Sequence, residues 1–297
     1  MEYVDLLVFG PHPDDLEIGL GGTIAKHAAL GHRVGLCDLT AGEMGSNGTV
    51  DERIAEAEEA RAVLGALWRI NLRWPDRAIG RDGEQVRAAA RLIRDVRPRA
   101  VALPYWSDRH PDHGAASGVL TEAVFNAGLR RYEAGADPWR PAWTVYYFIN
   151  DSAPPSFVVD VSDHYERKRK ALACHRSQFT TAADGAVDTR LTSPLFSQLV
   201  ESRDAQFGAQ AGVRFAEGLI VRQPVMLEHL LTGAAGMERS VMEAARRGAA
   251  SAKASAGQGG GPADARAAGT ERKRVKAARR GAAFAKAPAG QGRGPRR

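Results

Sequence analysis

The sequence has few cysteines. Only two of its 297 residues are cysteine, Cys37 and Cys174, and they form no Cys-x-x-Cys pair. This pattern excludes a disulfide framework and is typical of a reducing compartment, so we predict a cytoplasmic location. Cys37 lies in the apolar run 34–39, where we expect a buried and unreactive thiol.

Signals that direct a chain to or through a membrane are also missing from the printed sequence. No apolar stretch approaches the roughly 20 residues that span a bilayer. The first residues, Met1–Asp5, have neither the basic region nor the cleavage motif of a secretory signal. We therefore expect no membrane partner.

Acidic residues are scarce at the C-terminal end of the chain. Residues 233–297 hold 15 basic residues (Lys and Arg) and 4 acidic residues (Asp and Glu). Residues 1–232 hold 26 basic and 31 acidic residues. The net charge of +6 therefore belongs to this tail, whose segment 244–262 recurs at 277–295. Two copies without an apolar face are too few for a solenoid. We predict a folded domain at 1–232 and a disordered basic tail at 233–297.

Within the domain, apolar strand-like runs alternate with helical patterns. This alternation predicts βαβ units and a Rossmann-like α/β fold, in which a mostly parallel sheet has helices on both faces. The expected strands are 4–9, 34–39, 67–72, 100–103, 144–149 and 157–161. The expected helices are 22–30, 51–64, 84–96, 114–129, 165–175 and 195–207, with Asp51 as an N-cap.

Two matching polar clusters stand about a hundred residues apart. His12–Asp15 (HPDD) follows the first expected strand, and His110–His113 (HPDH) follows the strand at 100–103. A single Pro-Asp pair is usually a turn or a helix cap. Two such clusters at the carboxyl ends of strands, however, lie where an open α/β sheet builds its ligand site. The pattern therefore favours one shared site.

The residue types of the two clusters suit a catalytic metal. His12, Asp15 and His113 offer two imidazoles and a carboxylate, a set that leaves an open position on zinc and also suits ferrous iron. Asp14 would then be free to take a proton from a water that attacks a carbonyl carbon. This arrangement favours metal-dependent hydrolysis over other metal chemistry.

The remaining members of the second cluster, His110 and Asp112, are expected on the other side of the attacked carbonyl carbon. His110, as an imidazolium, would stabilise the oxyanion or protonate the leaving amine. Asp112 would orient and charge that histidine, as a carboxylate does beside a catalytic imidazole.

Three glycines, Gly19, Gly21 and Gly22, follow the first cluster. They are expected to let the backbone approach a ligand before the helix at 22–30 begins. Their spacing differs from the dinucleotide-binding fingerprint, and carboxylates stand where a pyrophosphate would bind. We therefore do not interpret this segment as a nucleotide site.

On these residues the chain resembles the LmbE-like, PIG-L-type deacetylases. Proteins of this family are zinc-dependent and remove acetyl groups from N-acetylglucosamine-containing molecules. Their hallmarks stand here as Pro11–Asp15 and His110–His113. The segments 40–46 (TAGEMGS) and 199–204 (LVESRD) are similar to the branch that deacetylates N-acetylglucosaminyl malate in bacillithiol biosynthesis. The resemblance covers residues 3–231 and implies the same ligands, general base and oxyanion group as above, together with a homo-oligomer.

The resemblance also implies two substrate-binding residues. Arg53 stands in the place of an arginine that meets the acidic group of the substrate, which a guanidinium can bind bidentately. The alternative for Arg53 is an ordinary solvated helix face. Glu43 is expected to hydrogen-bond sugar hydroxyls. Ala41 departs from the branch, which often has a basic residue there.

Three functions stay open at this point. The first is deacetylation of N-acetylglucosaminyl malate. The second keeps the site but changes the substrate to an inositol conjugate, chitobiose, or an antibiotic or lipid-linked sugar, because specificity lies in the rim of a site. The third places the function in the basic tail, which would bind nucleic acid or another polyanion weakly. For the tail itself, the alternative is a dispensable solvated extension.

Overall fold

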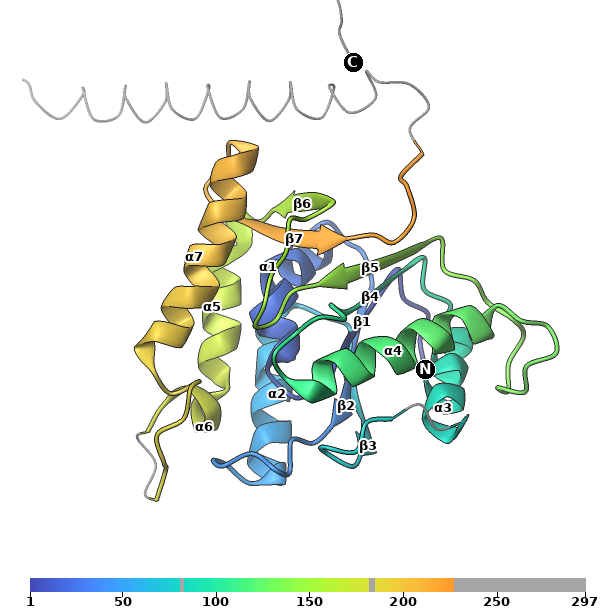
Figure 1. Ribbon diagram of the computed structural model, residues 1–297, viewed down its shortest axis with the longest axis horizontal. Helices are drawn as coiled ribbons and strands as arrows, with labels where there is room; N and C mark the ends of the chain where they lie inside the picture. The colour runs from blue at the N-terminus through green and yellow to red at the C-terminus, as the bar shows by residue number, and fades with distance from the viewer. Residues whose placement is uncertain (81–82, 182–184, 227–297) are drawn as a thin grey trace, which may run out of the picture. The chain divides into compact units, whose positions relative to one another are not determined.

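The computed structural model describes residues 1–80, 83–181 and 185–226 (Figure 1). These residues form a seven-stranded sheet in the order β3-β2-β1-β4-β5-β7-β6. The strands are β1 (Leu6–Gly10), β2 (Val34–Thr40), β3 (Trp68–Trp74), β4 (Ala100–Pro104), β5 (Trp143–Tyr147), β6 (Phe157–Asp160) and β7 (Ala216–Ile220). Neighbouring strands from β3 to β5 pair in parallel, and β7 is antiparallel to both of its neighbours. The predicted mostly parallel α/β sheet is confirmed.

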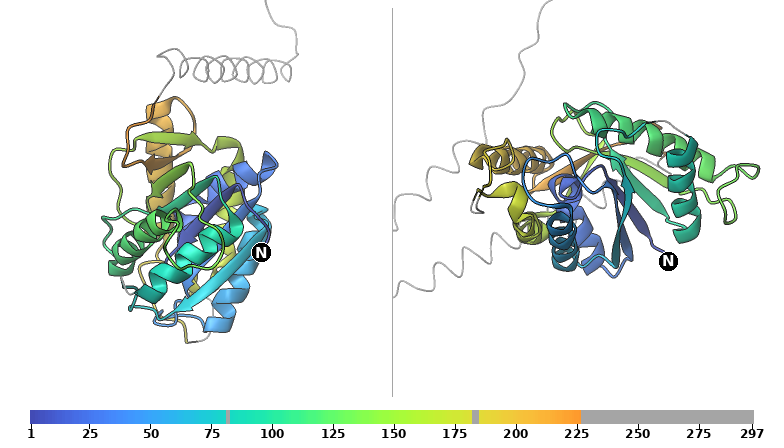
Figure 2. Two further views of the ribbon diagram at one scale, coloured as in Figure 1. Left: turned by 90° about the vertical axis from the view of Figure 1, so that its right-hand side faces the viewer. Right: turned by 90° about the horizontal axis from the view of Figure 1, so that it is seen from below.

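Helices cover both faces of this sheet (Figure 2). The helices are α1 (Asp15–Ala29), α2 (Val50–Leu64), α3 (Gly83–Val96), α4 (Pro111–Ala127), α5 (Tyr165–Cys174), α6 (Arg176–Phe179) and α7 (Pro194–Ala211), with a 3-10 turn at Ser162–His164. Apolar side chains of α3 and α4 pack on one face, and those of α1, α2, α5 and α7 pack on the other. In the described part of the chain, no helix has the length and apolar character needed to cross a membrane.

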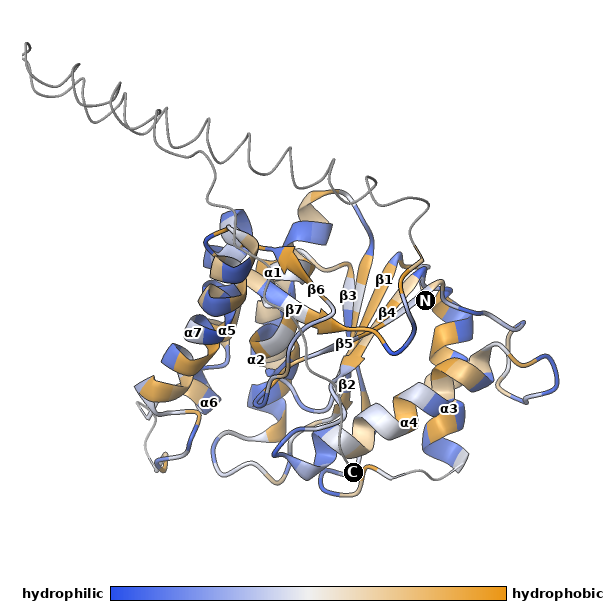
Figure 3. Ribbon diagram, turned by 45° about the horizontal axis from the view of Figure 1, so that its top comes forward, coloured by the Kyte–Doolittle hydropathy of each residue, from blue (hydrophilic) through white to orange (hydrophobic). Residues whose placement is uncertain are grey.

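The central strand β1 separates two apolar cores. Leu7 and Phe9 belong to the core with α3 and α4, whereas Leu6 and Val8 belong to the core with α1 and α2. Successive side chains of a strand point to opposite faces, so a strand covered on both faces becomes one continuous apolar run. Figure 3 shows this hydrophobic centre of the sheet. The first side chain after β1 that can ionise is His12, at the carboxyl end of the strand.

The strand order reverses at β1, because β2 pairs on one side of it and β4 on the other. His12 follows β1 and His110 follows β4. Both clusters therefore leave the same edge of two adjacent parallel strands, in the crevice where open α/β sheets bind ligands. The topology explains why segments a hundred residues apart converge.

The sequence pattern does not predict β7. Its residues include Glu217, which is 1% exposed and lies between β5 and β6 in the sheet. The carboxylate is accommodated because it accepts hydrogen bonds from Nζ of Lys168 and from the backbone N–H groups of Gly22 and Thr23. A buried charge needs such partners, and they come from distant parts of the chain.

The expectation for the glycines after the first cluster is wrong. Helix α1 begins at Asp15, so the glycines within Gly19–Gly22 lie inside it. They serve packing between elements, since a Cβ on Gly19 would collide with the ring of Tyr147. Glycine in a helix costs about 1 kcal/mol relative to alanine, and here it permits the helix to lie against the sheet.

The N-cap of α2 is Thr49 and not Asp51. The Thr49 side chain accepts from the backbone N–H of Glu52, whose carboxylate accepts from the N–H of Thr49. This reciprocal capping box satisfies two helix-end donors, which a cap at Asp51 would leave exposed.

The predicted tail at 233–297 and the predicted domain boundary at residue 232 lie outside the described residues. Both stay predictions from composition.

Candidate metal centre and active site

The first cluster turns sharply between β1 and α1. Asp14 has φ 114° and ψ −30°, a backbone conformation that residues other than glycine rarely adopt. Such a conformation costs about 1–3 kcal/mol and is often found at functional sites. Asp14 stands at the N-cap of α1 without a side-chain cap hydrogen bond, and it lines a pocket instead.

The second cluster begins helix α4. His110 is its N-cap, and Pro111 occupies the first helical turn, where its missing N–H has no partner to lose. The helix thus begins three residues before the expected position 114, and His113 lies in its first turn. The helix start fixes the spacing between His110 and His113.

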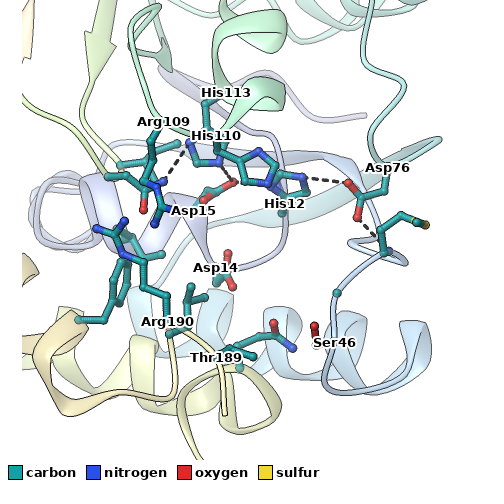
Figure 4. A pocket seen from close by; sticks show the side chains of 18 of the residues that line it. His12, Asp14, Asp15, Ser46, Asp76, Arg109, His110, His113, Thr189 and Arg190 are labelled. Atoms are coloured by element: carbon teal, nitrogen blue, oxygen red, sulfur yellow. Dashed lines mark hydrogen bonds and ion pairs between the residues drawn. The ribbon is translucent and has the colours of Figure 1, made fainter. Parts of the chain in front are cut away.

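Asp15 lies between the two histidines that the sequence assigns as ligands. Its Oδ2 is 3.0 Å from Nδ1 of His12 and 3.3 Å from Nε2 of His113. All three residues are buried. Figure 4 shows their side chains next to one another. The structure thus brings the three predicted ligands together, with one nitrogen of each ring directed at the same carboxylate oxygen.

Carboxylates also hold the outer nitrogen of each ring. Nδ1 of His113 lies 3.0 Å from Asp108, and Nε2 of His12 lies 3.2 Å from Asp76 and 3.4 Å from Asp112. Burial alone would lower the pKa of His12, but its carboxylate partners raise that pKa well above the usual value. Metal-binding histidines are usually held in this way, which fixes the ring and makes its free nitrogen more basic.

Carboxylates outnumber cationic side chains around the two rings: Asp15, Asp76, Asp108 and Asp112. Arg77 offsets part of this charge through its 2.7 Å pair with Asp112. Burial would lower the pKa of His113, but Asp15 and Asp108 raise it to about 9. The site therefore attracts positive charge, and its imidazole and carboxylate donors suit zinc or ferrous iron. The residues present fit a divalent metal.

Asp14 is buried beside Arg53. Burial raises the pKa of the Asp14 carboxyl to about 6, against the opposing effect of this guanidinium. The Arg53 nitrogens donate to the backbone oxygens of Gly42 at 2.8 Å and Pro13 at 2.9 Å, and one lies 3.5 Å from Asp14. Arg53 is 5% exposed, so the alternative of an ordinary solvated helix face is wrong. Its contact with substrate stays a prediction.

The contacts of His110 favour a neutral ring. Its Nδ1 accepts a 3.3 Å hydrogen bond from the backbone N–H of Asp112, which places the ring proton on Nε2. Burial, followed by the charges of His113 and His12, lowers the pKa of His110. This differs from the expected imidazolium, because the Asp112 carboxylate bonds to Arg77 and His12 instead. The backbone of Asp112, and not its carboxylate, orients the His110 ring.

Glu43 contacts Asp76 and does not itself line the described pocket. Its Oε1 accepts the backbone N–H of Asp76 at 2.7 Å, and Asp76 in turn contacts His12. Glu43 is exposed and is not among the described residues that line the pocket. The structure therefore connects Glu43 to His12 through Asp76, and its bond to sugar hydroxyls stays a prediction.

The clusters open into a pocket of about 430 Å³ (Figure 4). A cavity of this size accommodates a small molecule. Polar residues of its wall come from the loops after β2, β3, β4 and β5 and from the segment before α7: Ser46, Arg77, Arg109, Asn150, Thr189 and Arg190. The two clusters thus line a pocket whose wall offers many hydrogen-bond donors.

Two carboxylates of this site are not predicted from the sequence. Asp108 stands two residues before His110 and accepts hydrogen bonds from the backbone N–H groups of His110 and Asn150. Its place beside the second cluster is a signal that could have indicated it. Asp76 follows β3 and stands in no motif, so only the arrangement of the strands reveals it.

Comparisons with known proteins agree with this geometry. A family model described as PIG-L, GlcNAc-PI de-N-acetylase, matches residues 7–124. A diacetylchitobiose deacetylase from Thermococcus kodakarensis is 31% identical over 229 residues, which cover 72% of this chain and 81% of that protein. The chain belongs to the PIG-L family. The prediction of a metal-dependent N-deacetylase is thereby confirmed.

Other PIG-L relatives extend the likeness over most of the described chain. A 1D-myo-inositol 2-acetamido-2-deoxy-alpha-D-glucopyranoside deacetylase from Rhodococcus opacus is 29% identical, covering 72% of this chain and 94% of that one. The crystal structure of a conserved protein from Thermus thermophilus matches with a TM-score of 0.70 and 38% identity, covering 76% of this chain and 98% of that one. The two named deacetylases bear the names of inositol and chitobiose substrates, whereas the segments 40–46 and 199–204 lead us to expect a malate conjugate.

Proposed function

We propose that this PIG-L protein is a zinc-dependent hydrolase that removes the acetyl group of N-acetylglucosaminyl malate. The observation that carries the hydrolase assignment is the placement of Asp15 between His12 and His113, with both outer ring nitrogens held by carboxylates. The neighbouring Asp14 carboxylate lies 3.5 Å from a nitrogen of Arg53 and is not one of the carboxylates that contact the two rings. The choice of malate is supported by the segments 40–46 and 199–204, which are similar to the bacillithiol branch.

The side chains have distinct tasks in this reaction. His12, Asp15 and His113 would hold the metal, which when bound would polarise the acetamide carbonyl and make a water more acidic. Asp14 takes a proton from the water whose oxygen attacks the carbonyl carbon. It then gives that proton to the amine nitrogen as the C–N bond breaks, so acetate and a free amine leave.

His110 acts on the carbonyl oxygen. Its Nε2–H donates a hydrogen bond as negative charge develops there, and such preorganised donors contribute strongly to amide hydrolysis. The backbone N–H of Asp112 fixes the ring and keeps the proton on Nε2. The proposed role of His110 is therefore that of a neutral donor.

Acetate release tests this function. The purified protein is loaded with zinc or with ferrous iron and given N-acetylglucosaminyl malate, the inositol conjugate, diacetylchitobiose and free N-acetylglucosamine. We expect preferential turnover of the malate conjugate. Turnover confined to the inositol conjugate or chitobiose would contradict the malate assignment. No release from any of the four, with metal bound, would contradict the assignment to this sugar class.

Two other candidate functions remain to be separated from this one. The names of the relatives favour a neutral inositol or chitobiose substrate, and the same assay decides between them and malate. A polyanion-binding role of the tail at 233–297 is separated by deleting those residues. Acetate release should survive this deletion, because every residue of the proposed site precedes the tail.

A further inference from the structure

Four arginines line the pocket, and they differ in how their charge is used: Arg53, Arg77, Arg109 and Arg190. Arg53 donates to two backbone oxygens and lies beside Asp14, and Arg77 pairs with Asp112. Arg109 and Arg190 have no carboxylate partner among residues 1–80, 83–181 and 185–226. Two positive charges of the wall are thus available to a ligand.

Arg190 rests on an aromatic ring. Its guanidinium carbon lies 5.6 Å from the centre of the Phe196 ring, and Phe196 is 3% exposed in the first turn of α7. Contact with a ring face restricts a guanidinium without using its N–H donors. Within the part of the chain that the structure describes, the Arg190 guanidinium is thus held by a ring face and not by a hydrogen bond.

The segment that carries Arg190 is fixed to the loop between β2 and α2. The Asn47 side chain accepts the N–H of Val187 and donates to the Val187 oxygen, both at 2.9 Å. Thr189 and Thr192 exchange two backbone-to-hydroxyl hydrogen bonds of 2.9 and 3.2 Å. These contacts hold the backbone on both sides of Arg190, so little ordering is needed when a ligand binds.

We propose that Arg190 determines substrate choice by pairing with a carboxylate on the aglycone of the sugar. The assignment rests on the proposed function, since it names a residue that would recognise a carboxylate of malate in addition to the contact predicted for Arg53. In Figure 4, Arg109 and Arg190 lie at the left of the pocket, and the Asp76 carboxylate lies at the right. The ligand carboxylate is therefore expected at the side of the two arginines. A guanidinium binds a carboxylate bidentately, and an inositol ring or a second sugar offers no such group.

Steady-state kinetics on two conjugates test this assignment. In Arg190→Met, KM for N-acetylglucosaminyl malate should rise about 10- to 100-fold, the range for a hydrogen-bonded charge pair, with kcat nearly unchanged. KM for the inositol conjugate should stay the same. Arg190→Lys should fall between, because lysine keeps the charge but loses the planar fork. Arg130→Met is the matched control, since Arg130 is exposed and does not line the described pocket.

The results that would overturn the role of Arg190 differ from the result that would overturn the proposed function. An unchanged KM for the malate conjugate in Arg190→Met, or an equal loss with both conjugates, would overturn the assignment. If the wild type deacetylates only neutral conjugates, the proposed function is wrong, and inhibition of that turnover by free L-malate decides the role of Arg190. A Ki about tenfold higher in Arg190→Met would support the assignment, and equal Ki values would overturn it.

Discussion

Two buried groups of charged residues differ in how their charges are balanced. The first, which we call the inner network, consists of Glu17, Asp38, Arg69 and His175. Arg69 bonds to Asp38 through two nitrogens at 2.7 and 2.8 Å and to Glu17 at 2.6 Å. His175 lies 3.3 Å from Glu17. Two carboxylates thus face a guanidinium and an imidazole, so the carboxylates of the inner network do not outnumber its nitrogen bases.

The metal centre has the opposite character. Four carboxylates surround the rings of His12 and His113, and the backbone at Asp14 has a positive φ of 114°. The members of the inner network are not among the residues with positive φ, and they do not line the pocket. Burial of charge is therefore not a sufficient sign of function. Excess charge of one sign, strain and access to a cavity together distinguish the active site.

The largest effect should follow removal of a ring from the metal centre. His113→Ala should lose the metal and release no acetate above background, because it removes a proposed ligand and leaves Asp15 with His12 as its remaining ring partner. Metal content by mass spectrometry and acetate release give the two readouts. His175→Ala is the matched variant, since it removes a buried histidine of the inner network and should keep stoichiometric metal. Full metal content in His113→Ala would remove that residue from the ligand set.

Asp14→Asn should separate the metal from the chemistry. The amide cannot take a proton, so kcat should fall about 10²- to 10⁴-fold while the metal content stays that of the wild type. Acetate release is measured at saturating substrate, with metal content determined on the same sample. Retention of more than about a tenth of the wild-type rate would contradict the role of general base.

Some parts of the fold and of the site are predictable from the sequence, and others are not. Strands β1 to β4 and both histidine clusters are predictable because buried parallel strands are apolar runs and the clusters follow two of them. Asp76 and the pairing of Glu217 with Lys168 depend on segments that meet only after folding. The packing role of the glycines in α1 is not predicted for the same reason. Gly19, for example, packs against Tyr147, which lies far along the chain.

Asp108→Asn should weaken the metal centre without removing a ligand. The amide cannot hold the ring of His113 as the carboxylate does, so metal affinity should fall about 10- to 100-fold. Competition with a chelator of known affinity measures this change. Asp151→Asn alters an exposed neighbouring carboxylate and should leave affinity unchanged. Equal affinities for Asp108→Asn and the wild type would mean that the carboxylate does not support the metal.

The smallest effect on catalysis, and a large one on stability, should come from the inner network. Arg69→Met leaves Glu17 and Asp38 buried without their guanidinium, and such a loss lowers the free energy of unfolding by about 3–5 kcal/mol. Arg69→Lys should lose less, because it keeps the charge. Urea unfolding measures both variants, and kcat per metal-loaded molecule should stay close to that of the wild type. A loss of kcat in Arg69→Lys with unchanged stability would show that the inner network acts on the catalytic step, and the contrast between the two groups of charges would fail.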